Sequence, residues 1–139
     1  MTLPIVLSLA LILLAIAHAW WAMGGIWPSA SESLLARTVI GDGRIRMPPP
    51  WQCAAVALAL VVGAAWPWLI MAWPDSQLVF IGSIVTGAIF FIRGTAGYSP
   101  RWRGHFTAEP FRTRDFYLYS PLCLALGVGF IALLTREMQ

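Results

Sequence analysis

The sequence contains no lysine and few charged residues of any kind. Only 11% of its 139 residues are Asp, Glu, Lys or Arg, whereas 59% are hydrophobic. A typical soluble domain carries about 25% charged residues, so a soluble chain of this size could not cover so much apolar surface. The composition therefore excludes a soluble globular protein and indicates a single transmembrane domain, which we place at residues 1–139.

Patterns for binding metals or forming disulfides are also missing from the sequence. The two cysteines, Cys53 and Cys123, form no Cys-x-x-Cys pair, and the two histidines, His18 and His105, are far apart. Zinc sites usually draw on closely spaced pairs, and haem in a membrane bundle would need a second intramembrane histidine. We therefore expect no metal and no cofactor, and we expect both cysteines to be small buried residues.

Long stretches without a charged residue dominate the rest of the chain. An α-helix rises about 1.5 Å per residue, so about 20 residues cross the ~30 Å hydrocarbon core of a bilayer. The sequence predicts an all-α integral membrane protein, a bundle of four transmembrane helices with a long, ordered first loop and a long, ordered third loop. The predicted helices cover residues 3–23, 51–73, 78–93 and 115–134.

A cleaved signal peptide is the alternative interpretation of the first stretch. Ala17-His18-Ala19 has the small-x-small form of a cleavage site, but no basic segment precedes the apolar run. We therefore interpret residues 3–23 as a spanning helix.

The first loop, between residues 24 and 50, carries signals of local structure. Ser29-Ala30-Ser31-Glu32 is typical of a capping box, so we expect a short helix from there to about Thr38. Gly41-Asp42-Gly43 predicts a turn, and the prolines of Met47–Pro50 predict a stiff extended segment. The loop should therefore be ordered at the membrane surface.

All nine basic residues are arginines, and they are distributed unequally along the chain. Eight lie in or at the edges of the first and third loops, and only Arg136 lies on the other side. By the positive-inside rule, the first and third loops should face the cytoplasm, and both termini should face outward. The eight are Arg37, Arg44, Arg46, Arg93, Arg101, Arg103, Arg112 and Arg114.

Small residues recur every four positions in the two central helices. Closely spaced small residues let helix backbones approach each other in lipid, so these positions predict helix packing within the monomer or, alternatively, between two copies. They are Ala55, Ala59 and Gly63 in the second helix, and the pairs Gly82–Thr86 and Ser83–Gly87 in the third.

The polar residues with most to explain lie near the predicted cytoplasmic ends of the helices. Arg93 ends the third helix, Asp115 begins the fourth, and Tyr119 follows Asp115 by one turn. His18 and Trp21 lie near the end of the first helix. These five residues are our candidate ligand-binding site, because their side chains together could hold an anionic head group and transfer a proton.

A purely structural role is the alternative for the same residues. Arg93 and Asp115 could simply pair and hold the third helix against the fourth, since an unpaired charge at the membrane edge is costly. We expect a direct or water-bridged contact between them in either case. Pro121 should also free the carbonyl of Tyr117 in the fourth helix, within reach of Arg93.

Several motifs resemble those of a small bacterial family of four-helix membrane proteins known as a domain of unknown function. The resemblance covers most of the chain, and it implies a four-helix fold in the bacterial inner membrane but no activity. The motifs are His18 with Trp20 or Trp21, Gly24-Gly25-Ile26-Trp27-Pro28, Phe90-Phe91-Ile92-Arg93-Gly94, Phe111-Arg112-Thr113-Arg114-Asp115 and Leu118-Tyr119-Ser120-Pro121-Leu122-Cys123.

A binding or accessory role fits these observations best: a bundle whose cytoplasmic edge holds an anionic amphiphile or lipid head group. An enzyme acting on a lipid-soluble substrate is the first alternative, but no nucleophile–base pair is recognisable, so no catalytic residue is assigned. A small transporter is the second, and it usually needs an ionisable residue deep in the membrane. Expected partners are membrane lipids and either further copies of the chain or a larger membrane complex, but no nucleic acid.

Overall fold

The computed structural model of the protein describes residues 1–137. Within them, four segments are long and apolar enough to cross a membrane: α1 (Thr2–Ala22), α3 (Pro50–Ala72), α4 (Gln77–Ala96) and Phe111–Thr135. The described residues contain helices and no strand. The predicted all-α fold of a multi-pass membrane protein is therefore confirmed, and the first two helices each begin and end one residue earlier than predicted.

The last spanning segment is continuous but changes its helical form along its length. It consists of α6 (Phe111–Arg114), a π-helical turn η1 (Asp115–Tyr119) and α7 (Ser120–Glu137). α4 also runs three residues further than predicted, to Ala96. Both differences lie beside the predicted polar site.

The two long loops are ordered and contain short helices. The first loop holds α2 (Glu32–Val39), and the third holds α5 (Pro100–His105). The predicted capping box is wrong in detail, because Ser31 rather than Ser29 caps α2 by accepting a hydrogen bond from the N–H of Leu34. Glu32 is then the first helical residue, and its carboxylate accepts the N–H of Met47 at 3.0 Å across the loop.

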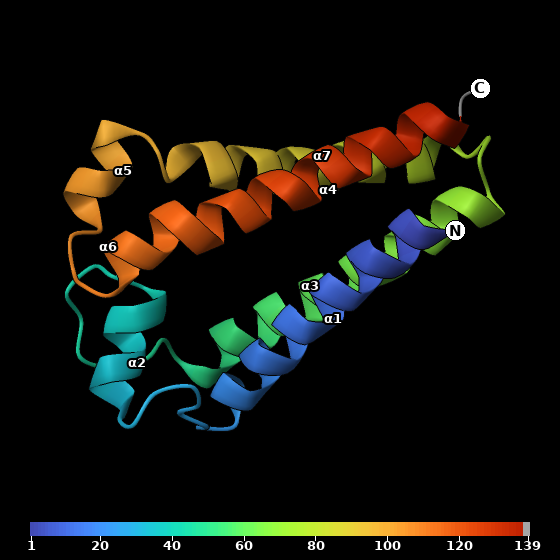
Figure 1. Ribbon diagram of the computed structural model, residues 1–139. Helices are drawn as coiled ribbons and strands as arrows, with labels where there is room; N and C mark the ends of the chain where they lie inside the picture. Colours follow the sequence, from blue (N-terminus) through green and yellow to red (C-terminus); the bar gives the residue numbers. More distant parts are fainter. Residues whose placement is uncertain (138–139) are drawn as a thin grey trace.

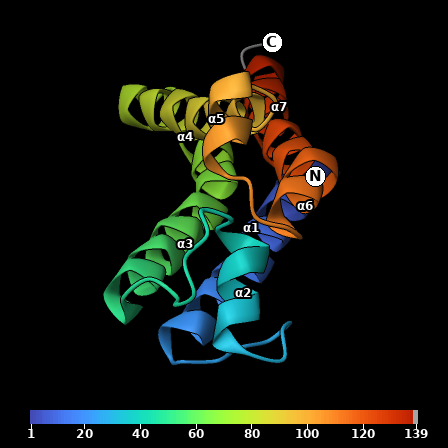
Figure 2. The same cartoon turned by 90° about the vertical axis from the view of Figure 1, so that its left-hand side faces the viewer.

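The spanning helices form two pairs, α1 with α3 and α4 with α7, and the pairs diverge (Figure 1). They meet at the end that carries the N-terminus, which we call the terminal end. They separate toward the opposite end, the loop end, formed by residues 23–49 and 93–115. There α2 and α6 contact each other across the gap between the pairs (Figure 2).

The position of the buried core explains this divergence. The core cluster joins the first half of α1, the far ends of α3 and α7, and the start of α4, all of which lie toward the terminal end. Gly129 of α7 lies against Leu7 of α1, which is a member of the cluster. The members of the cluster are Leu7, Leu11, Ala64, Ile70, Val79, Leu126, Phe130, Leu133 and Leu134.

Glycines bring α4 and α7 close together. A Cβ atom at Gly94 would lie 2.7 Å from Leu124 Cγ, and one at Gly127 would lie 2.9 Å from the backbone nitrogen of Phe91, so neither position has room for a side chain. Gly87 is buried against Phe130 in the same contact. The predicted packing role of the Ser83–Gly87 pair is therefore confirmed.

The small residues predicted to pack in the second helix, Ala55, Ala59 and Gly63, are not all buried within the monomer, and packing between two copies stays a prediction. Gly63 is buried, but Ala55 and Ala59 are exposed. α3 instead buries a face that includes Cys53, Ala57 and Ala64. Ala55 and Ala59 therefore lie outside the buried helix contacts of residues 1–137.

Candidate functional site

The predicted contact between Arg93 and Asp115 is present. Nη2 of Arg93 donates to Oδ1 of Asp115 at 2.6 Å and joins the last turn of α4 to the start of η1. Asp115 is only 2% exposed, whereas the Arg93 side chain is 29% exposed. The sequence predicted this contact because both residues end helices on the same side of the membrane.

Two further side chains complete the surroundings of the Asp115 carboxylate. The Trp102 indole N–H of α5 donates to Oδ2 at 2.9 Å, and the Ser120 hydroxyl donates to Oδ1 at 3.3 Å. The Arg93 guanidinium also lies 4.6 Å from the centre of the Trp102 ring, in a cation–π contact. Both carboxylate oxygens therefore have donors, and the cluster of Arg93, Trp102, Asp115 and Ser120 carries no net charge.

The π-helical turn determines which carbonyl Pro121 leaves free. The N–H of Ser120 bonds to the carbonyl of Asp115, five residues earlier, instead of to the carbonyl four residues earlier. With this spacing the missing N–H of Pro121 falls opposite Phe116, so the Phe116 carbonyl is freed, a carbonyl that the sequence did not predict. The Phe116 carbonyl accepts the Tyr98 hydroxyl at 3.2 Å, so the third loop rather than Arg93 satisfies it.

Tyr119 connects the last spanning segment to the first loop. Its hydroxyl donates to the Thr38 carbonyl of α2 at 3.1 Å. Nearby, the Ala108 N–H donates to the Gly41 carbonyl at 3.1 Å, and Phe111 packs on Gly41. Gly41 has φ +79° and no room for a Cβ atom, so both its conformation and this contact require glycine.

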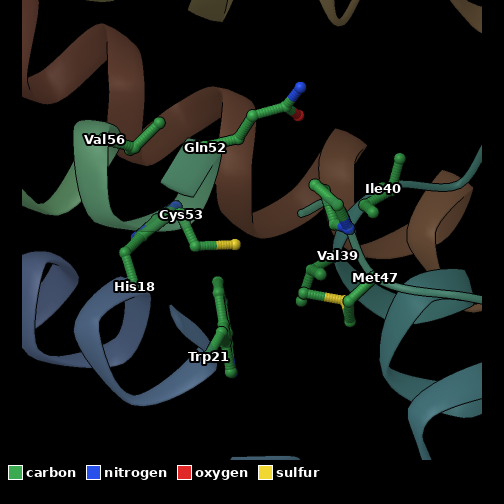
Figure 3. A pocket seen from close by; sticks show the side chains of 9 residues that line it. His18, Trp21, Val39, Ile40, Met47, Gln52, Cys53 and Val56 are labelled. Carbon is green, nitrogen blue, oxygen red and sulfur yellow. The ribbon is translucent and has the colours of Figure 1, made fainter. Parts of the chain in front are cut away.

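His18 and Trp21 line a different cavity, between α1, α3 and the first loop (Figure 3). Their rings meet edge to face, 4.9 Å between centres. We call this cavity the loop-end pocket, and its volume is about 190 Å³. The residues that line it are His18, Trp21, Val39, Ile40, Met47, Pro48, Gln52, Cys53 and Val56.

One hydrogen bond fixes the role of the His18 ring. Nδ1 lies 2.8 Å from the carbonyl of Leu14, one turn earlier in α1. A carbonyl oxygen can only accept, so Nδ1 carries the proton and Nε2 of the neutral ring is an acceptor. The Trp21 indole N–H is used elsewhere, because it donates to the Trp27 carbonyl at 2.8 Å.

A larger, apolar groove lies between the two helix pairs. Its volume is about 670 Å³, and Ala55, Ala59 and Gly63 of α3 line it together with Ile89 and Phe90 of α4. It shares Val56 with the loop-end pocket. We call it the lateral groove.

Polar atoms in and around the lateral groove are already bonded. Two residues that line the groove, Thr86 and Trp66, have polar side-chain atoms. The Thr86 hydroxyl donates to the Gly82 carbonyl at 2.8 Å. Trp66 packs against Gly82, and the Trp66 indole N–H donates to the Val79 carbonyl at 3.2 Å. The groove therefore offers a lining suited to hydrocarbon.

The loop end carries a strong positive charge. It contains eight arginines and four carboxylates, so its formal net charge is +4 with neutral histidine. The carboxylates are Glu32, Asp42, Glu109 and Asp115. One carboxylate pairs locally, since Arg44 Nη2 lies 2.6 Å from Asp42 Oδ2. The hydrogen-bonded Arg44 guanidinium holds the pKa of Asp42 below its ordinary value.

The five predicted site residues thus divide into separate places. Arg93 and Asp115 contact each other, His18 and Trp21 contact each other, and Tyr119 reaches Thr38. Within residues 1–137 no hydrogen bond, ion pair or ring contact links the His18 pair to the Arg93 pair, and no group of three metal-ligating side chains could hold a metal ion.

Sequence reasoning missed several residues that belong to these places. Trp102 and Ser120 complete the Asp115 cluster, whereas Gln52 lies at the loop-end pocket. Gln52 carried a signal, because it is a polar side chain in the first turn of an otherwise apolar predicted helix. Trp102 carried none, since only the folding of the third loop brings it to Asp115.

Comparison with known proteins places the chain in a family. No curated protein and no solved structure matches it. The model of a family described as "Protein of unknown function (DUF3995)" matches residues 11–130, which include all four spanning helices in whole or in part. The chain therefore belongs to the DUF3995 family of proteins of unknown function, as the resemblance of its motifs implied.

Proposed function

We propose that this protein is a membrane-embedded binding protein whose lateral groove holds the hydrocarbon chain of an amphiphile. The observation that carries the proposal is the exposed pair of small residues, Ala55 and Ala59, on the wall of a 670 Å³ apolar groove. Small residues in a membrane helix usually mark a close contact with another helix. Here they leave space that a chain of methylene groups would fill.

Packing energetics support an occupant of this kind. Apolar side chains that line an unfilled space lose dispersion contacts, because they have no partner atoms on one side. The groove follows α3 from Ala55 to Trp66, which is about 16 Å at 1.5 Å per residue. Trp66 packs on Gly82 at the far end, so the chain would enter from the side of the loop end or from the bilayer.

The charge of the loop end supports a preference for anionic lipids around it. Exposed arginines supply this charge, since Arg93 is neutralised by Asp115. An anionic head group near the loop end therefore stays a prediction that rests on exposed residues such as Arg101 and Arg112. With anionic and zwitterionic lipids offered together, native mass spectrometry should show more anionic lipid retained, and equal retention would contradict this preference.

Photo-crosslinking tests the groove directly. The purified full chain is incubated with a lipid that carries a diazirine in its acyl chain, and crosslinked peptides are mapped. Ala59→Phe should fill the groove and reduce crosslinks to its walls at least fivefold. Ala54→Phe is the matched control, because Ala54 is exposed on α3 outside the groove and the same side chain there should leave these crosslinks unchanged.

Two results would contradict the proposal. Either both variants keep the wild-type pattern of crosslinks, or the wild type shows no enrichment at the groove over the outer face of α3. Thermal unfolding followed by circular dichroism would show that both variants remain folded.

A further inference from the structure

We infer that the loop-end pocket binds the head group of a hydroquinone, an uncharged six-membered ring with hydroxyl groups, whose hydrocarbon tail occupies the lateral groove. This inference rests on the proposed function, because it concerns the head group of the same molecule. It assigns His18 as the acceptor of a ligand hydroxyl.

Continuity between the two spaces is the first reason. Val56 of α3 lines both the pocket and the groove. The first turn of α3 lines the pocket with Gln52 and Cys53. The groove begins within the next turn, at Ala55. A molecule with its tail in the groove therefore has its head beside the pocket.

The size of the pocket is the second reason. An engineered apolar cavity of about 150 Å³ is large enough to bind benzene. The loop-end pocket, at about 190 Å³, has room for one such ring with small substituents. Trp21 forms an aromatic wall against which a flat ring can pack (Figure 3).

Charge is the third reason. The nine lining residues include no Asp, Glu, Lys or Arg. A phosphate or carboxylate head group would lose its hydration there without gaining a partner of opposite charge, which is costly. The lining therefore selects an uncharged head group, whereas the arginines of the loop end act on lipids outside the pocket.

Hydrogen bonding is the fourth reason, and it selects between two redox forms of the ring. Nδ1 donates to the Leu14 carbonyl, so Nε2 bears no proton in the neutral form of the His18 ring and in that form can only accept. A hydroquinone donates through its hydroxyl groups, whereas a quinone offers only acceptors. Gln52 also lines the pocket, and its amide can donate to a quinone or accept from a hydroquinone, so it favours neither form. His18 should therefore make the reduced form bind more tightly than the oxidised form, by about five- to tenfold for one hydrogen bond.

Equilibrium dialysis of the full chain in detergent tests the inference. The probe is a benzoquinone with a ten-carbon tail, offered under anaerobic conditions in its reduced and oxidised forms, and bound ligand is quantified by chromatography. We expect the wild type to prefer the reduced form, and His18→Phe to lose this preference. His105→Phe, a change at an exposed histidine outside this pocket, should keep it.

A second variant separates the pocket from the folding of α1. His18→Gln retains a side-chain acceptor and should restore part of the preference for the reduced form. Loss of the preference in His18→Phe with partial recovery in His18→Gln supports the assigned hydrogen bond.

Two results would overturn the inference and leave the proposed function intact. One is equal binding of hydroquinone, quinone and a ten-carbon alcohol, with no effect of His18→Phe. The other is preferential binding of a ten-carbon phosphate. In both, Ala59→Phe would still abolish binding, whereas a failure of the proposed function would show as binding that is unaffected by Ala59→Phe.

Discussion

At the scale of single residues, the Asp115 carboxylate has the most closely defined surroundings. It is almost fully buried, and it receives hydrogen bonds from an arginine, a tryptophan and a serine on three different elements. Removing one member of a buried ion pair leaves the other charge without compensation, which is usually worse than removing both. The geometry therefore favours the structural interpretation of Arg93 and Asp115.

The two members of this pair should respond unequally to substitution. Arg93→Ala leaves buried Asp115 uncompensated and should cost about 3 kcal/mol of unfolding free energy. Asp115→Ala should cost less, because the partly exposed Arg93 side chain can still reach water. Unfolding in mixed detergent micelles gives both values, and the double variant should cost less than their sum.

The pair of Asp42 and Arg44 at the surface is the control for these substitutions. Arg44→Ala should cost at most about 1 kcal/mol, because the Arg44 side chain is 45% exposed and water replaces its contacts. If the costs of the Arg93 and Asp115 substitutions simply add, the two side chains are not coupled and the structural role assigned to them is wrong.

At the scale of elements, close helix contacts and loop contacts hold the loop end together. The sequence anticipated part of this. Apolar length predicted the four spanning segments, and small-residue spacing predicted close helix packing at Ser83 and Gly87, without saying which helix would be the partner. The same spacing does not correspond to buried residues at Ala55 and Ala59, because it identifies a smooth helix face and does not say whether a helix of the same chain, a second copy or lipid covers that face.

Other features could not be predicted because they depend on contacts between distant segments. Pro121 signalled an irregular helix, but only the i to i+5 spacing in the structure identifies Phe116 as the freed carbonyl. The single site expected from five residues also divided into separate places. Residues near the same membrane face lie at similar depth, but sequence does not say how far apart the helices carry them.

Gly94 should tolerate no larger side chain. In Gly94→Ala, the added Cβ would lie 2.7 Å from Leu124 Cγ and 2.9 Å from the Ser120 carbonyl, so α4 and α7 would have to separate. Overpacking of this kind typically costs about 1–3 kcal/mol, measurable by thermal unfolding in detergent. Gly104→Ala is the control, since nothing lies within 4 Å of a Cβ there. Equal stability of the two variants would contradict the close packing described for α4 and α7.

The Tyr119 hydroxyl should stabilise the contact between the last spanning segment and the first loop. Tyr119→Phe removes its bond to the Thr38 carbonyl and should cost about 1 kcal/mol. It should also speed amide hydrogen exchange in α2, because the partner carbonyl belongs to that helix. Tyr117→Phe, at a tyrosine that is 75% exposed, should change neither quantity. Unchanged exchange in α2 after Tyr119→Phe would show that this hydroxyl does not hold the first loop to the last spanning segment.

At the scale of the whole molecule, the two ends differ both in charge and in how closely the helices pack. The loop end carries the arginines and the open side of the diverging helix pairs, whereas the terminal end carries the compact core. An amphiphile lies in a bilayer with a similar polarity, its head at the surface and its chain toward the middle. The groove and pocket therefore match the direction of such a molecule.

The arginine distribution predicts that the loop end faces the cytoplasm and that both termini face outward. Alkaline phosphatase fused after residue 139 should be active, because this enzyme requires an oxidising compartment outside the cytoplasm, and a cytoplasm-active fluorescent protein at the same position should be dark. A fluorescent fusion without phosphatase activity would reverse the topology and place the loop end outside.

The central claim, that the lateral groove holds one hydrocarbon chain, is tested most directly by weighing the protein with whatever it retains from the membrane. Native mass spectrometry after gentle extraction should show one bound amphiphile per chain in the wild type and in Ala54→Phe. Ala59→Phe should show little or none, because its ring occupies the groove. If the bound mass is the same in all three proteins, or is missing from all of them, the groove is not the binding site.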